Sequence, residues 1–339
     1  LQCDVAVDER SAAFFALGVA KASRLPVLLL ATSGTAPANW LPAVIEASQA
    51  GVPLILISAD RPPELQGVGA NQAIDQTGLF GPHVRSSHMP GTPVENFDAG
   101  YLHRLAARIY EQATWPHPGP VHINQPFREP LMPTGETAVS VPLEKFVISY
   151  APLLTDPSDI RELATRIAGR PGVIVCGEMP IAAGFAEAVS SLAAQLHSPL
   201  LAEPLSNLRF GGHDRFRLCV RYNLWLNDPQ AREAAKPEWV LRFGAFPVTR
   251  RLQELVRSAS ELHALIEPWP RWTDPLHQLT HVLRVDPAAF CRALLAEAPQ
   301  AAPASWQAGF AALDAAVSRE NGGHIAALVA ELPAGTAVF

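Results

Sequence analysis

The sequence of 339 residues contains few cysteines. The four, Cys3, Cys176, Cys219 and Cys291, lie far apart and form no CxxC pair. This spacing excludes a cysteine-based zinc site and a disulfide framework, and it favours a reducing compartment. No apolar run reaches the roughly 18 residues that a membrane span needs, and no signal-peptide pattern is present. We therefore expect a cytoplasmic protein with no membrane partner.

A surplus of positive charge is also absent. The net charge is −6, which argues against nucleic acid as a partner, because such partners need a basic face. The sequence has no Walker loop and no serine-nucleophile elbow, and no GxGxxG motif opens the first helix. His83, His88 and His122 lack a metal-ligand spacing such as HxxxH, so we expect none of them to be a metal ligand.

What the sequence does contain is a regular alternation of apolar runs and helical patterns. Residues 25–34, 52–60 and 119–127 are predicted strands, and residues 39–51 and 95–114 are predicted helices. Continuous runs rich in Val, Ile and Leu indicate strands that are covered on both faces. Strand and helix in alternation predict a parallel sheet of the α/β class.

The same pattern occurs a second time further along the chain. Strands are predicted at 172–178, 198–203, 239–245, 263–268 and 281–286, and helices at 179–197 and 248–258. We therefore predict two consecutive parallel-sheet domains, Rossmann-like or flavodoxin-like, over 1–133 and 159–300. A proline-containing stretch without a strong helical period predicts a linker over 134–158. Residues 301–339 are predicted to hold a hinge and the start of a third domain.

Both ends of the chain have the sequence pattern of incomplete strands. "LQCDVAV" (1–7) predicts a strand already under way, and "LPAGTAVF" (332–339) predicts the start of another. Because domains seldom end inside an apolar run, we expect a piece of a longer enzyme.

Polar clusters follow the predicted strands. They are "DER" (8–10), "TSGTA" (32–36), "SADRPPEL" (58–65) with "GANQ" (69–72), and "VTRR" (248–251). Ligands of α/β proteins bind beyond the carboxyl ends of strands. Each cluster also has a plainer reading, so no single one decides the function.

Two of these clusters precede helices. In "TSGTAPAN" the backbone N–H groups can approach an anion or a cofactor ring, or Thr35 or Asn39 simply caps the next helix. Glu9 can be a catalytic acid, or an acid at a helix start that interacts with the helix dipole.

The remaining clusters hold cations and amides. Arg61, held by two prolines, suits a carboxylate, but it can also form a minor surface pair with Asp60. The amides of Asn71 and Gln72 suit hydroxyls and carbonyls, or belong to an ordinary loop. Arg250 and Arg251 suit an acidic substrate, or lie in a solvated first helical turn.

The segments "DER", "TSGTAPANWLPAVIEA" and "ADRPPELQGVGANQAIDQ" carry a specific resemblance. With "HINQPFREPL" (122–131), "GVIVCGEM" and "VLRVD", the whole chain resembles the 2-succinyl-5-enolpyruvyl-6-hydroxy-3-cyclohexene-1-carboxylate synthase family. These are thiamine-diphosphate (ThDP) enzymes of menaquinone biosynthesis. The resemblance implies a pyrimidine-binding domain over 1–133, a central, transhydrogenase-like domain over 159–300, and the start of a diphosphate-binding domain within 301–339.

The resemblance also implies roles for single residues. Glu9 would meet N1′ of the cofactor's aminopyrimidine and promote its proton relay. The other implied roles are contact with the pyrimidine end for Ser33 and Gly34, binding of acid groups for Arg61, Arg250 and Arg251, and binding of substrate or intermediate for Asn71 and Gln72.

The implied reaction is decarboxylation of 2-oxoglutarate and addition of the succinyl carbanion equivalent to isochorismate. The Mg²⁺ (or Mn²⁺) and diphosphate ligands are expected beyond residue 339, so no metal ligand is expected within the chain and the chain alone is expected to be inactive. The family implies a homodimer or homotetramer, because its cofactor lies between subunits. Two alternatives stay open: another ThDP carboligase or decarboxylase resembling acetolactate synthase, and a non-catalytic α/β ligand-binding module.

Overall fold

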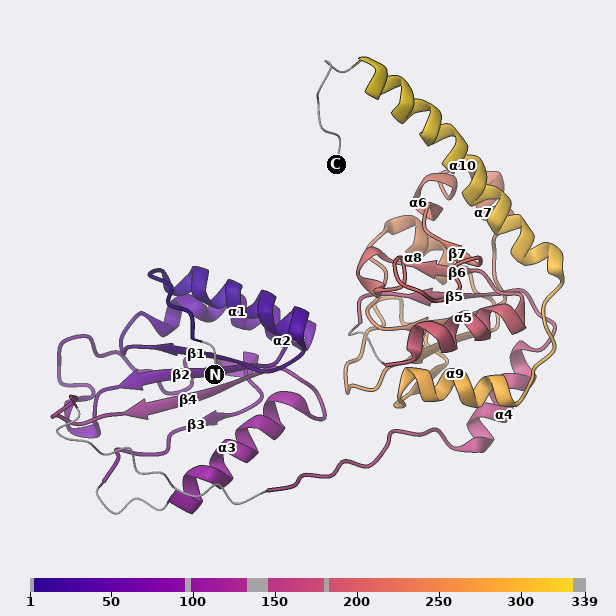
Figure 1. Cartoon of the computed structure of the whole chain (residues 1–339). Helices are drawn as coiled ribbons and strands as arrows, with labels where there is room; N and C mark the ends of the chain where they lie inside the picture. The colour runs from indigo at the N-terminus through magenta and orange to yellow at the C-terminus, as the bar shows by residue number, and fades with distance from the viewer. Residues whose placement is uncertain (1–2, 95–98, 133–145, 180–182, 332–339) are drawn as a thin grey trace. The chain divides into compact units, whose positions relative to one another are not determined.

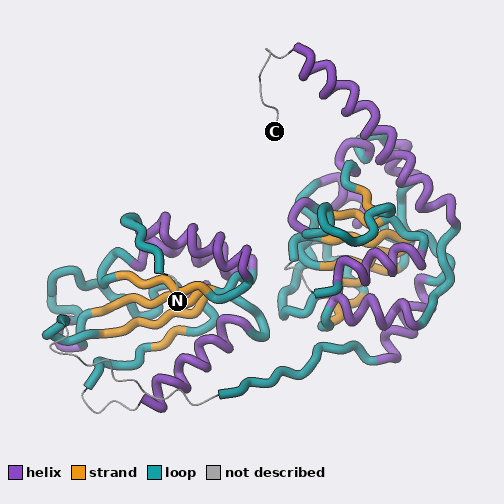
Figure 2. The backbone as a smooth tube through the Cα atoms, in the orientation of Figure 1, coloured by secondary structure: helices purple, strands orange, loops and turns teal. Residues whose placement is uncertain are grey.

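The computed structural model describes residues 3–94, 99–132, 146–179 and 183–331. The chain divides into two compact units, Leu1–Tyr150 and Ala151–Phe339, and each contains one sheet of parallel strands with helices (Figures 1 and 2). The predicted α/β class with two parallel sheets is confirmed. The division lies inside the range 134–158 predicted as a linker. Residues 134–145 of that range, and the predicted strand at 332–339, lie outside the described residues.

The sheet of the first unit has the strand order β1-β2-β4-β3. Its strands are β1 (Val27–Ala31), β2 (Leu54–Asp60), β3 (Ser87–His88) and β4 (Pro120–Pro126). Its helices are α1 (Glu9–Ser23), α2 (Leu41–Ala50) and α3 (Ala99–Thr114), with a short 3-10 helix, η1 (Pro37–Trp40), before α2. β2 and β4 pair with Leu54 opposite Pro120 and Ser58 opposite Asn124.

Helix α1 is fixed at both ends by its own sequence. The Asp8 carboxylate accepts the Ser11 backbone N–H at 2.7 Å, which satisfies a free donor of the first turn and lowers the pKa of Asp8. At the other end, Arg24 is left-handed (φ 62°), and β1 begins three residues later. Since the connection is so short, α1 runs antiparallel to β1, and its first residue lies at the carboxyl edge of the sheet.

The predicted strand at residues 1–7 is wrong for the residues that the structure describes. Residues 3–7 form no strand, and Val5 and Val7 are 93% and 100% exposed. An isolated strand leaves its backbone groups without partners, and no described strand pairs with this segment. Alternation of valine with polar residues is therefore not enough to form a strand here.

The sheet of the second unit has the strand order β10-β9-β8-β5-β6-β7. The strands are β5 (Gly172–Cys176), β6 (Leu200–Ala202), β7 (Leu218–Cys219), β8 (Trp239–Phe243), β9 (Leu262–Ile266) and β10 (His281–Leu283). All residues of β5, β8 and β9 are buried. The sequence of β5 is apolar throughout, as expected for a strand covered on both faces, whereas β8 and β9 also bury Arg242 and His263.

Helices cover both faces of this sheet and form one core on each. One core includes side chains of α4 (Pro157–Ile167), α5 (Phe185–Leu196) and α9 (Pro287–Ala296). The other includes α6 (Tyr222–Trp225), α7 (Pro229–Ala234), α8 (Arg250–Arg257) and α10 (Ala304–Glu331). No described helix is both long enough and apolar enough to cross a membrane.

The first half of α10 packs into the second unit. Trp306 donates its indole N–H to the Gly172 carbonyl at 2.8 Å, and Phe310, which is 2% exposed, packs edge-on against Trp225 with ring centroids 5.4 Å apart. These contacts tie residues 304–314 to the core under β5 and β7. The assignment of residues 301–339 to a third domain stays a prediction.

Candidate functional site

The carboxyl edge of the first sheet gathers most of the residues predicted for a site. β1 ends at Ala31 and β2 at Asp60, so the loops that follow them, 32–36 and 61–76, begin side by side at this edge. Polar groups beyond neighbouring parallel strands form the usual ligand site of an α/β sheet.

Ser33, Gly34 and Gln72, which come from two of the polar clusters, lie together at this edge. The Ser33 hydroxyl donates to the Gln72 carbonyl at 2.9 Å, and the Gln72 side-chain amide donates to Thr32 Oγ1 at 3.0 Å. Gly34 has a φ of 85°, and a Cβ there would lie 3.1 Å from Gln72 Cγ. Glycine is therefore required for the two loops to approach this closely.

The buried side chain of Gln76 fixes the positions of these two loops by hydrogen bonds. It is 1% exposed, and its Oε1 accepts the Gly34 backbone N–H at 2.7 Å. Its amide nitrogen donates to Asn124 Oδ1 at 2.7 Å and to the Ala59 carbonyl at 2.9 Å. One side chain thus connects the loop after β1 to strands β2 and β4.

Arg61 is held by the same network. The buried Asp60 carboxylate accepts the Arg61 backbone N–H and the Asn124 side-chain amide, each at 2.7 Å. The Arg61 side chain donates through Nε to the Asn71 carbonyl at 3.1 Å. Its terminal nitrogens have no acceptor within the described ranges, so they can donate hydrogen bonds to the carboxylate of a ligand.

The deepest part of the network contains Ser58 and His122, both 0% exposed. Ser58 Oγ and His122 Nε2 are 2.8 Å apart, and the Ser58 hydroxyl donates to Asn124 Oδ1 at 2.9 Å. Burial lowers the pKa of His122 to about 4, so the ring is neutral near pH 7. Because the pair is sealed from solvent and the hydroxyl already has an acceptor, it stabilises the sheet and is not a serine nucleophile with its base.

Glu9 begins α1 at the carboxyl edge and is half-buried. Asp8 supplies the N-terminal cap, so the Glu9 side chain is not needed for that purpose. It makes no hydrogen bond or ion pair with any described residue, which leaves both carboxylate oxygens available. α1 also contacts η1, the 3-10 helix that follows the Ser33–Gly34 loop.

Arg250 and Arg251 lie in the second unit, where they open α8. Arg250 Nε is 3.1 Å from Glu254 Oε1, and Arg251 Nη1 is 2.8 Å from Glu254 Oε2. The hydrogen bond from Arg251 lowers the pKa of the Glu254 carboxyl most, and the hydrogen bond from Arg250 lowers it further. The Arg250 side chain is 87% exposed, so its charge is accessible to a ligand despite the pair.

Four buried residues, Gln76, Asn124, Ser58 and His122, lie within the quoted motifs, but the sequence analysis assigned none of them a role in the site. A signal for them exists in the sequence: "HINQ" places polar side chains within a run that reads as a covered strand, and "GANQAIDQ" contains a second glutamine four positions after the first. Polar groups in a strand that is covered on both faces need hydrogen-bonding partners. This requirement favours hydrogen bonds between the polar side chains of these two segments.

Within the described part of the chain, no group of three or more His, Cys, Asp or Glu side chains is placed to hold a metal ion. Among the described residues, this edge supplies the Glu9 carboxylate, the Arg61 guanidinium, amides, hydroxyls and a glycine turn.

The fold and this edge correspond to a known class of domain. Residues 1–79 match the family model of the thiamine pyrophosphate enzyme N-terminal TPP binding domain. The first unit is thus similar to the N-terminal domain of thiamine pyrophosphate enzymes.

Comparison with individual proteins indicates a narrower family within this class of enzymes. The chain is 58% identical, over 100% of its length, to the 2-succinyl-5-enolpyruvyl-6-hydroxy-3-cyclohexene-1-carboxylate synthase of Dechloromonas aromatica (strain RCB), of which it covers 63%. It is 40% identical to the synthases of the same name from Bacillus velezensis and Geobacillus kaustophilus, over 90% and 98% of the chain and 54% and 61% of those proteins. The resemblance to this synthase family is confirmed, and the chain spans between about half and two thirds of the relatives that it matches.

Proposed function

We propose that the protein containing this chain catalyses the ThDP-dependent decarboxylation of 2-oxoglutarate and the addition of the resulting succinyl carbanion equivalent to isochorismate. The products are 2-succinyl-5-enolpyruvyl-6-hydroxy-3-cyclohexene-1-carboxylate and CO₂. The observation that carries the proposal is the 58% identity over the whole chain to a synthase of that name. The arrangement of the carboxyl edge of the first sheet supports it.

The chemistry of this edge fits the aminopyrimidine end of ThDP. When bound, ThDP supplies a nucleophilic carbon that can attack a keto group and stabilise the charge left by loss of CO₂. The Glu9 carboxylate, which has no hydrogen-bond or ion-pair partner among the described residues, can hold a proton or exchange it with a ring nitrogen. The Ser33–Gly34 turn, which has no side chain at Gly34 and is fixed by Gln76, offers a flat backbone surface for a ring.

The charges and amides at the two predicted substrate regions fit acidic, hydroxylated substrates. The terminal nitrogens of Arg61 have no acceptor in the part of the chain that the structure describes, and Arg250 and Arg251 add two further guanidinium groups. A guanidinium can donate two parallel hydrogen bonds to a carboxylate. Asn71 and Gln72, both exposed beside Arg61, can donate to and accept from hydroxyl and carbonyl groups.

The metal and the oligomer are proposed by similarity to the family. Mg²⁺ or Mn²⁺ and the diphosphate would be held by residues beyond position 339, in line with the relatives being longer than this chain. A homodimer or homotetramer would bring the diphosphate-binding part of one subunit to the Glu9 edge of another.

The test is the activity of the full protein with Glu9→Gln against the control Glu46→Gln, which removes an exposed acid from α2 in the same unit. An amide cannot accept and return the proton, so we expect Glu9→Gln to lower kcat by at least about 100-fold with unchanged circular dichroism, and Glu46→Gln to stay within about twofold of the parent. Equal activities of the two variants would contradict the role of Glu9.

A substrate comparison distinguishes the proposed reaction from its alternatives. We expect consumption of 2-oxoglutarate with isochorismate and none of pyruvate alone. Turnover of pyruvate would instead support an enzyme resembling acetolactate synthase. Failure of the full protein to turn over either substrate in the presence of ThDP and Mg²⁺ would support a ligand-binding module.

A further inference from the structure

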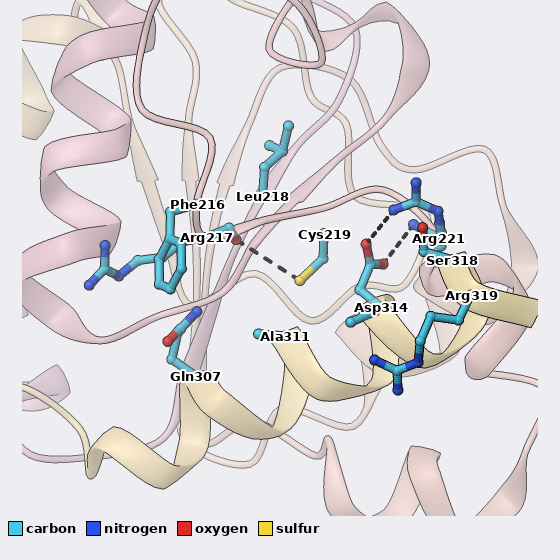
Figure 3. Close-up of a pocket in the computed structure, with 11 residues that line it drawn as sticks. Phe216, Arg217, Leu218, Cys219, Arg221, Gln307, Ala311, Asp314, Ser318 and Arg319 are labelled. Carbon is cyan, nitrogen blue, oxygen red and sulfur yellow. Dashed lines mark hydrogen bonds and ion pairs between the residues drawn. The ribbon is translucent and has the colours of Figure 1, made fainter. Parts of the chain in front are cut away.

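A hollow of about 400 Å³ lies in the second unit between the segment 216–221 and residues 307–319 of α10 (Figure 3). Three arginines line it, Arg217 and Arg221 from the segment around β7 and Arg319 from α10. Neither the predicted substrate residues nor the Glu9 edge contribute to it. The hollow therefore requires its own explanation.

The charges of the hollow are unbalanced. Asp314 is the one acid that lines it, and this carboxylate is already occupied. It accepts the Arg221 backbone N–H at 2.8 Å, the Arg221 guanidinium at 3.2 Å and the Trp225 indole N–H at 3.4 Å. Arg221 and Asp314 thus neutralise each other, and two positive charges remain.

Those two charges belong to Arg217 and Arg319. Arg217 Nε is buried and has no hydrogen-bond partner in the described chain, and its guanidinium lies 5.6 Å from the centre of the Phe216 ring. Arg319 forms no ion pair with any described residue. A buried donor without an acceptor is uncommon in folded proteins, so an acceptor brought by a ligand would complete this arrangement.

The two guanidinium groups lie at opposite ends of the hollow. Figure 3 shows Arg217 beside Phe216 at one end and Arg319 near Asp314 at the other. The surface between them includes Leu218, Ala311 and the thiol of Cys219, and the polar side chains of Gln307 and Ser318 also line the hollow. Burial raises the pKa of Cys219, so the thiol stays neutral and this middle part is apolar.

We propose that this hollow binds a small dicarboxylate whose apolar spine lies along α10, with one carboxylate at Arg217 and the other at Arg319. Two separated cations favour a molecule with two anionic ends over one compact anion such as phosphate or sulfate. Each carboxylate can accept two parallel hydrogen bonds from its guanidinium. The spine removes the apolar surface between them from water.

The test is isothermal titration calorimetry of the 339-residue chain with succinate, glutarate and adipate, and with hexanoate and inorganic sulfate as comparison anions. We expect one of the dicarboxylates to bind at least about tenfold more tightly than hexanoate, because hexanoate leaves one guanidinium without an acceptor. Sulfate that binds as tightly as every dicarboxylate, or the absence of any saturable heat, would overturn the proposal.

Three variants assign the binding to this hollow. Arg217→Gln and Arg319→Gln are each expected to weaken binding at least about tenfold. Arg257→Gln, which removes an exposed arginine of α8 outside the hollow, is expected to leave it within about twofold. Loss of binding in Arg61→Gln, with the other variants unchanged, would place the probe at the first-unit edge and refute the hollow, while leaving the proposed reaction intact.

Discussion

Replacing Gln76 by leucine tests whether the buried polar network holds the Ser33–Gly34 turn in place. The two side chains have similar volume, so the change removes hydrogen bonds without opening a large cavity. Gln76 Oε1 is the acceptor of the Gly34 N–H at 2.7 Å. Its amide nitrogen donates to Asn124 Oδ1 and to the Ala59 carbonyl.

The expected cost follows from these partners. The Gly34 N–H loses its acceptor in a buried position, which costs about 1–3 kcal/mol. Asn124 Oδ1 keeps the Ser58 hydroxyl as a donor, so the two remaining bonds count only at their net value of roughly 0.5–1.5 kcal/mol each. The free energy of unfolding of the first unit should therefore fall by about 2–6 kcal/mol.

Hydrogen exchange followed by mass spectrometry measures this loss of stability in the first unit separately from the second. Peptides covering β2, β4 and residues 32–36 should exchange about 30-fold to about 20,000-fold faster, since 1.4 kcal/mol corresponds to a tenfold change in the opening equilibrium. Gln49→Leu makes the same chemical change on the exposed face of α2 and should have no such effect. If both variants exchange alike, Gln76 does not organise the turn.

Two further predictions concern stability. Because burial lowers the pKa of His122 from 6.5 to about 4, the unfolded chain binds more protons between these values, and the first unit should lose about 3 kcal/mol as the pH falls through this window. His122→Asn should flatten that profile in β4 peptides; an unchanged profile would contradict the assignment. Gly172→Ala would bring a Cβ to 1.9 Å from the Trp239 ring and should destabilise the second unit by about 1–3 kcal/mol or more. Gly212→Ala, with open space at its Cβ, is the control for the same denaturation experiment.

The sheets could be predicted from the sequence because burial on both faces leaves a continuous apolar run. This holds for "LILI" in β2 and "GVIVC" in β5, whose residues are almost all buried. The site loops were predictable for a related reason: Ser33, Gly34 and Arg61 directly follow such runs. Topology then decides that they meet at one edge.

The remaining features depend on contacts that no local pattern carries. β3 and β7 each have two residues, too few for any periodicity, and they exist because a neighbouring strand offers them a partner. Residues 3–7 have the pattern of a strand but pair with no strand that the structure describes. The role of Gln76 depends on Asn124 and Gly34, which are distant in sequence.

The strand order of the first unit has a consequence for how the chain is made. β4 lies between β2 and β3. Leu54 of β2 pairs with Val27 of β1 on one side, but on the other side its partner is Pro120, 66 residues later in the chain. During synthesis, the β2 edge therefore stays open until the polypeptide has emerged past β4, and an open edge of apolar residues invites pairing with other chains. Nascent chains stalled before β4 has emerged should bind chaperones. This binding should end once "GPVHINQP" (119–126) has left the ribosome.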